Sequence, residues 1–378
     1  MLIFDIKSIF HHYKFFKDKS ISATRIFRYT KLLELIDKYK NICSITTIGL
    51  SVEKRKIFKI KWGIGKIKVF IWSQMHGNET TGTKSIFDIL HFFSKNIDYN
   101  FVKFLFKNLT ILFVPMLNPD GSEKFQRRNA INIDLNRDAV RLQSPEIQVL
   151  FREINKNNPH ILFNLHDQRS IYNVGEKCFN PAILSFLSPS IKKNVTTTSK
   201  KKSMGIIYFM TKELKNILPE IGSIGRFSDE WYPTATGDKF QQLGYPCVLF
   251  EAGNYIKDIQ KELIRKYNTI SILTGFYFLS SKEKYFEKNY KYYFSIPKNK
   301  NILLDKIYRK VQIQKNGNKY LIDIGIMNFE KFNLKKGSLS FIQKVVDIGD
   351  LSHFFAYEDL PGKQFFSKKF PKIGDIEF

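Results

Sequence analysis

Short apolar runs separated by helical patterns are the feature of this sequence that most restricts its fold. Runs rich in β-branched and aromatic residues indicate buried strands. They are residues 57–61, 68–72, 110–114, 161–165 and 248–250. Strands and helices that alternate over about 280 residues favour an α/β fold, with a mixed, largely parallel twisted sheet covered by helices on both faces. In such a fold, functional side chains gather at the carboxyl ends of the strands.

Three helical patterns accompany these strands. The second opens with Ser144 as an N-cap, followed by Pro145 and Glu146, and runs toward Ile154. The first and third have amphipathic stripes. These stripes are Thr83, Ile86, Leu90 and Phe93, and then Ile259, Leu263, Tyr267, Ile270 and Leu273.

The pattern changes after residue 298, where short strands replace the alternation. Residues 306–314 and 319–326 flank Asn316-Gly317, a pair that readily supplies the positive φ angles of a tight hairpin turn. We therefore expect an α/β domain over residues 1–295 and a small C-terminal β-rich domain over residues 298–378, with the Pro297 region as the linker.

The charge of the chain invites a nucleic-acid interpretation, since 61 basic and 35 acidic residues give a net charge of +26. The lysines, however, are scattered along the whole sequence, and no RNA-binding motif accompanies them. The one basic cluster, residues 192–202, is typical of a solvated loop. We expect no nucleic-acid partner despite the basic charge.

Composition also bounds the location of the protein. No apolar stretch reaches the roughly 18 to 20 residues of a membrane-spanning helix, and the first residues lack the pattern of a signal peptide. Cys43, Cys178 and Cys247 have no disulfide or thiolate-zinc spacing, so we expect small buried apolar groups. These features predict a cytoplasmic protein without a membrane partner.

Residues able to bind a metal follow two of the predicted strands. His76 and Glu79 come just after the strand that ends at Trp72, and His166 directly follows residues 161–165. Two histidines and one glutamate that leave a fourth position open are typical of catalytic zinc. Taken singly, His76 and Glu79 also suit a helix-capping turn, and His166 suits a hydrogen-bonded core histidine.

A further polar set completes the candidate site. Glu251 is the charged residue at the end of a buried strand, so we interpret it as a general base, with a salt-bridged glutamate as the alternative. Arg127, Arg128 and Arg137 lie in the polar stretch 126–138. Guanidinium groups bind carboxylates and polarise carbonyls, which indicates an anionic amide substrate unless the stretch is a surface ion-pair loop.

Five motifs follow one another along the chain: HGNE (76–79), NPDG (118–121), DLNR (134–137), NLHD (164–167) and FEAGN (250–254). In order and context, they resemble the zinc metallocarboxypeptidases of the carboxypeptidase A type, in a bacterial-like form. The resemblance covers residues 30–280 and includes residues 49–55 as an opening strand and turn.

The resemblance implies one Zn²⁺ ion held by His76, Glu79 and His166, with Asp134 orienting His76. Glu251 would activate the attacking water. In the same family pattern, Asn136 and Arg137 would grip the C-terminal carboxylate of a peptide. Arg127 would stabilise the oxyanion, with Arg128 as its rival.

Two family features have less definite counterparts. Tyr232 lies near the place of the tyrosine that covers substrate, without a matching motif. Residues 236–238 lie where the specificity pocket belongs. NPDG is expected to be a shaping turn.

The resemblance thus predicts a hydrolase, a zinc metallopeptidase that cleaves C-terminal peptide bonds in a peptide or small amide substrate with a free carboxylate. The alternative is a zinc amidohydrolase of the aspartoacylase and succinylglutamate desuccinylase branch, which acts on N-acyl amino acids and also carries a C-terminal β domain.

Overall fold

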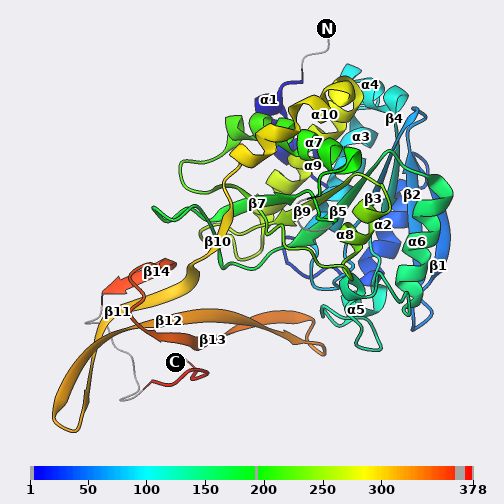
Figure 1. Cartoon of the computed structure of the whole chain (residues 1–378). Coiled ribbons are helices and arrows are strands. Elements are labelled where there is room, and N and C mark those ends of the chain that lie inside the picture. Colours follow the sequence, from blue (N-terminus) through cyan, green and yellow to red (C-terminus); the bar gives the residue numbers. More distant parts are fainter. Residues whose placement is uncertain (1–3, 192–194, 362–370, 377–378) are drawn as a thin grey trace.

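The predicted strands assemble into one eight-stranded mixed sheet, seen in a computed structural model that describes residues 4–191, 195–361 and 371–376 (Figure 1). The strand order is β1-β2-β4-β3-β5-β9-β7-β8. The central strands β4, β3, β5 and β9 run parallel, whereas β1, β2 and β7 introduce antiparallel pairs. The strands are β1 (Ser44–Leu50), β2 (Lys56–Trp62), β3 (Ile67–Trp72), β4 (Leu109–Val114), β5 (Ile161–Asp167), β7 (Ala182–Leu187), β8 (Ser223–Arg226) and β9 (Cys247–Ala252).

Helices cover both faces of this sheet, which confirms the predicted fold class. Alternate strand residues point to opposite faces, so Val69 and Ile71 join one core cluster and Phe70 and Trp72 join another. The first face is covered by α1 (Ile6–Phe16), α2 (Tyr29–Tyr39), α3 (Thr81–Lys95), α4 (Asn100–Asn108), α7 (Thr198–Leu214), α9 (Glu262–Lys282) and α10 (Phe286–Asn289). The second face is covered by α6 (Pro145–Asn157) and α8 (Thr236–Gln242).

Short helical elements fill the connections. They are α5 (Pro119–Glu123), η1 (Leu135–Arg137), η2 (Lys215–Ile217), η3 (Glu283–Tyr285) and η4 (Tyr290–Ser295). Both α5 and η1 lie between β4 and α6, and they carry residues of the NPDG and DLNR motifs, respectively.

A buried ionic network joins the N-terminal helices to the sheet-covering layer. The guanidinium of Arg265 in α9 donates to the carboxylate of Asp88 in α3, at 2.6 and 2.8 Å. The hydroxyl of Tyr13 in α1 donates to the same carboxylate at 2.5 Å. Asp18, which is fully buried, accepts from Tyr39 and Lys38 of α2 at 2.6 and 2.7 Å. These charges are paired, as burial requires.

The C-terminal residues form a separate four-stranded sheet of order β13-β12-β11-β14. Its strands are β11 (Leu303–Lys315), β12 (Asn318–Asn333), β13 (Ser338–Gly349) and β14 (Phe355–Pro361). The predicted hairpin is confirmed: Lys315 pairs with Asn318, and Asn316 and Gly317 have φ angles of 51° and 81°. This sheet is the C-terminal β-rich domain expected from the sequence.

The junction between the two sheets is tied by backbone hydrogen bonds. Strand β10 (Asn299–Asn301) pairs antiparallel with β6 (Tyr172–Val174), which follows β5. The carbonyl of Pro297 accepts from the N–H of Arg226 at 2.7 Å. The domain boundary between residues 295 and 298 stays a prediction. Strand β10, just after it, pairs with a strand of the α/β part.

Three details differ from the expectations. The basic cluster is not all loop: residues 192–194 lie outside the described part, and from Thr198 onward the segment is the first turn of α7, where Lys200 is buried. Cys178 is exposed, although Cys43 and Cys247 are buried. Ile259 precedes α9 and is 61% exposed, because the helix begins only at Glu262.

In the described residues, no helix is both long and apolar enough to cross a bilayer.

Candidate metal centre and active site

The HGNE loop connects β3 to α3 and is shaped by buried polar contacts. The amide of Gln74, a residue with a positive φ of 48°, donates to the carbonyl of Gly77 at 2.9 Å and to the Ser122 hydroxyl at 2.8 Å. A Cβ at Gly77 would lie 2.1 Å from the carbonyl carbon of Gly121. Glycine is therefore required where the HGNE and NPDG loops touch.

His166 and Glu251 reach the site from neighbouring parallel strands. They are register partners in β5 and β9, so their side chains leave the same face of the sheet side by side. Both side chains are buried. The strand-end placement that the sequence predicts for them is the one observed.

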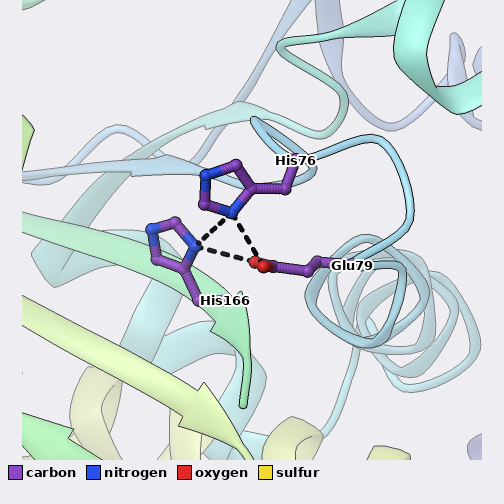
Figure 2. Close-up of side chains that lie close together, drawn as sticks. All are labelled: His76, Glu79 and His166. Atoms are coloured by element: carbon purple, nitrogen blue, oxygen red, sulfur yellow. Dashed lines mark hydrogen bonds and ion pairs between the residues drawn. The ribbon is translucent and has the colours of Figure 1, made fainter. Parts of the chain in front are cut away.

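Three side chains converge on one point (Figure 2). Nδ1 of His76 lies 2.8 Å from a carboxylate oxygen of Glu79, and Nδ1 of His166 lies 2.8 Å from the other oxygen. The two Nδ1 atoms are 3.2 Å apart. One ligand atom from each residue falls within 4.8 Å of the others, and all three residues are buried.

The donor set fits a divalent cation such as zinc. Nε2 of His76 lies 3.0 Å from a carboxylate oxygen of Asp134 and therefore carries the proton that this acceptor needs. This tautomer leaves a lone pair on Nδ1, directed at the other imidazole and at Glu79. A cation bound among two imidazole nitrogens and a carboxylate would satisfy all three lone pairs.

The pKa values of Glu79 and Glu251 are shifted in opposite directions by their surroundings. Burial acts to raise the pKa of Glu79, but the adjacent imidazoles of His76 and His166 outweigh burial and hold that pKa well below its usual range. Burial also raises the pKa of Glu251, and repulsion from Glu79 and Asp167 raises it further. Glu79 is thus suited to bind a cation, and Glu251 to accept and return a proton.

The structure distinguishes between the two rival arginines. Arg127 donates through Nε to Asp134 at 2.9 Å and through Nη1 to Glu79 at 3.2 Å. Arg128 turns away and donates to the carbonyl of Asn132 at 3.0 Å. Only Arg127 of this pair has its guanidinium at the metal-binding group.

Asn136 and Arg137 follow Asp134, the residue that contacts His76, and both are oriented by their neighbours. The amide oxygen of Asn136 accepts from the backbone N–H and the hydroxyl of Thr236, at 2.9 and 2.8 Å. The Asn136 amide nitrogen is therefore left as the donor for an incoming anion. The Arg137 guanidinium lies over the ring of Tyr232, 4.0 Å from its centroid, so the structure brings that tyrosine to the predicted substrate-binding arginine.

The segment expected to hold the specificity pocket begins α8. Besides Thr236, it contributes Asp238, whose carboxylate accepts the N–H of Tyr232 at 3.2 Å. Burial raises the pKa of Asp238 to about 6. Residues 236–238 thus contact both Asn136 and the Tyr232 backbone.

Two supporting groups were not predicted from the sequence. Lys261 is buried with its ammonium 3.7 Å from Asp167, the residue after His166, and Asp167 also accepts from Thr81 at 2.7 Å. Asp120 of NPDG accepts from Ser51 at 2.7 Å and from Arg55 at 2.6 Å. The available signal for the second group was that NPDG and residues 49–55 both belong to the resemblance, whereas nothing in the local sequence marks Lys261.

The mixed sheet and the His-Glu-His group beside its strand ends define an α/β domain with side chains placed to hold a metal ion. Residues 29–159 match the family model described as zinc carboxypeptidase. The match includes His76, Glu79, Asp134, Asn136 and Arg137 and ends before His166.

Curated relatives and solved structures agree with this match. Carboxypeptidase 2 of Trichophyton rubrum is 35% identical over 105 residues, which are 27% of this chain and 19% of that protein. Carboxypeptidase D of Homo sapiens is 30% identical over 145 residues, which are 34% of this chain and 10% of that protein. The chain therefore spans about a fifth or less of the length of these relatives.

Among solved structures, a metallo-carboxypeptidase from Burkholderia cenocepacia superposes with a TM-score of 0.52 at 16% identity, covering 67% of this chain and 70% of that chain. Carboxypeptidase A from Helicoverpa armigera gives a TM-score of 0.52 at 16% identity, covering 75% and 83%. Residues 29–159 thus match the zinc carboxypeptidase model, and the α/β part of the chain has the fold of these solved carboxypeptidases. These findings do not favour the acyl-amino-acid branch.

Proposed function

We propose that the protein is a zinc-dependent metallocarboxypeptidase that hydrolyses the C-terminal peptide bond of substrates with a free carboxylate. The observation that carries this proposal is the convergence of His76, Glu79 and His166, with Glu251 beside them in strand register. The family match over residues 29–159 supports it.

The substrate is fixed at its carboxylate end. Arg137 and the amide nitrogen of Asn136 supply charged and neutral donors that match a terminal carboxylate. Tyr232, which lies on Arg137, covers the bound residue from the solvent side. Holding the terminus in this way places the scissile carbonyl at the metal-binding group and turns the reaction into a positioned attack.

Each group at the site then has a separate role in the reaction. His76, Glu79 and His166 would hold one zinc ion, which would supply Lewis-acid chemistry and lower the pKa of bound water to about 7. Glu251 takes a proton from the attacking water and later delivers it to the leaving amine. Arg127 faces the carbonyl oxygen and stabilises its developing negative charge.

Metal analysis combined with a peptide assay tests this proposal. We expect one zinc per chain by elemental analysis, and release of the terminal residue from an N-blocked tripeptide with a free carboxylate. Removal of zinc by a chelator should abolish the release, and added zinc should restore it. A zinc-loaded protein that leaves such peptides intact but hydrolyses N-acyl amino acids would contradict the proposal.

A further inference from the structure

The C-terminal sheet is docked on loops that border the candidate site. Ile171, which follows β5, packs in one cluster with Leu304, Ile307 and Met327 of the C-terminal sheet. The hydroxyl of Tyr357 in β14 donates to the carbonyl of Ser170 at 3.2 Å. Ser170 lies four residues beyond His166 in the chain. The base of the sheet is therefore anchored to the segment that leaves the metal-binding strand.

The β12–β13 hairpin reaches from this base back to the α/β part. In Figure 1 the hairpin extends beneath α5, whereas the β11–β12 hairpin extends away from the main sheet. The ring of Phe332, near the hairpin tip, lies 5.5 Å from the buried ring of Phe125. Phe125 stands two residues before Arg127.

A second contact ties the hairpin to the segment between α1 and α2. Glu330 of β12 forms an ion pair with Arg25, whose side chain is 14% exposed. The carbonyl of Arg25 accepts from the hydroxyl of Thr80 at 2.6 Å, and Thr80 directly follows Glu79. The hairpin thus touches the loop that carries Arg127 and is linked through Arg25 to the residue after Glu79, while the base of the sheet touches the loop after His166.

From these contacts we infer that the β12–β13 hairpin limits the size of the substrate, so that the site accepts short peptides and excludes long or folded C-terminal segments. The inference rests on the proposed carboxypeptidase activity. An extended chain advances about 3.3 Å per residue. Each residue added before the scissile bond therefore carries the substrate farther from Arg137, toward the loops of the site that the hairpin contacts.

A shortened hairpin gives the main test. Lys331 and Ser340 are directly opposite in the β12–β13 pairing, so an Asn-Gly turn can replace residues 332–339 without a change of register. The matched control replaces residues 314–319 of the distant hairpin by Asn-Gly, between the opposite residues Ile313 and Tyr320. The substrates are peptides of 3, 6 and 12 residues and a small folded protein, all with the same three C-terminal residues.

For the zinc-loaded wild type, we expect kcat/KM to fall at least tenfold from the tripeptide to the folded protein. The variant lacking residues 332–339 should gain at least tenfold on the 12-residue peptide and on the folded protein, and stay within twofold on the tripeptide. The control variant should match the wild type throughout. An unchanged length profile in the shortened variant, or the same gain in the control, would overturn the inference.

A point substitution gives a second test that does not require the shortened variant to fold. Phe332→Ala removes the ring that meets Phe125, and Phe329→Ala removes a ring of the same strand that is 41% exposed. We expect Phe332→Ala to raise kcat/KM on the 12-residue peptide two- to fivefold and Phe329→Ala to leave it unchanged; equal effects would count against the inference. Absence of tripeptide hydrolysis by the wild type would instead overturn the proposed function and, with it, the role of the hairpin.

Discussion

Replacing Glu251 by glutamine separates proton transfer from metal binding. The substitution keeps the size of the side chain and leaves His76, Glu79 and His166 in place. The carboxylates that repel Glu251 cannot substitute for the base, because Glu79 is held by the imidazoles and Asp167 by Lys261 and Thr81. Loss of a positioned base lowers turnover by about 10²- to 10⁴-fold, which corresponds to about 3–5 kcal/mol in the barrier.

The same substitution should stabilise the metal-free protein. Burial and repulsion from Glu79 and Asp167 raise the pKa of Glu251, so at neutral pH folding must either protonate this carboxyl or bury its charge. We expect Glu251→Gln to raise the free energy of unfolding without zinc, and to raise it less when zinc supplies a compensating positive charge.

Three measurements on one preparation test this reasoning. Elemental analysis should show wild-type zinc content, tripeptide assays should show at least a hundredfold fall in kcat, and urea unfolding with a chelator should show the gain in stability. The exposed Glu220 provides a control, since Glu220→Gln should change none of the three. Turnover within tenfold of wild type in the zinc-replete variant would refute the assignment of Glu251 as the base.

Three further substitutions probe the neighbours of the site and the core. Asp134→Ala removes the acceptor of His76 and should weaken zinc binding 10- to 100-fold, measured by competition with a chromogenic chelator; unchanged affinity would contradict the orienting role. Arg137→Ala should lower kcat/KM on peptides with a free terminus at least tenfold more than on their C-terminal amides, and equal losses would argue against carboxylate recognition. Burial acts to raise the pKa of Asp18, but hydrogen bonds from Lys38, Tyr39 and Ser20 lower it from 3.8 to about 2. That shift contributes about 2 kcal/mol above pH 4 and is lost as the pH falls toward 2, so Asp18→Asn should destabilise the protein by that amount at pH 7 and by clearly less at pH 3 in urea unfolding; a pH-independent difference would refute it.

The central strands were predictable because each one is a short run of apolar, mostly β-branched or aromatic residues. Residues 68–72 and 161–165 were identified from sequence and lie within β3 and β5. The turn at Asn316-Gly317 was equally accessible, since its φ angles depend on those two residues alone. The start of α9 was not predictable from the apolar stripe, because the stripe already includes Ile259. The helix begins only where the Asp258 carboxylate accepts its first N–H groups.

The site was predictable where it depends on strand ends. His166 and Glu251 follow buried strands, and parallel neighbours bring such residues together. The choice between Arg127 and Arg128 depends on a loop whose course is set by contacts with Asp134 and Asn132, which no local pattern encodes. The contact of Phe332 with Phe125 joins positions about 200 residues apart and required the docked C-terminal sheet.

The carboxylate of Asp134 joins two functions of the site through a single oxygen. Oδ1 lies 3.0 Å from Nε2 of His76 and accepts the backbone N–H of Asn136 at 2.9 Å. A displacement of this one atom would move the proposed metal ligand His76 and the proposed substrate anchor Asn136 together. In the proposed function, affinity for the cation and affinity for the peptide terminus are therefore not independently adjustable at this position, and variation that tunes one of them without the other must arise elsewhere, for example at Thr236 or Tyr232.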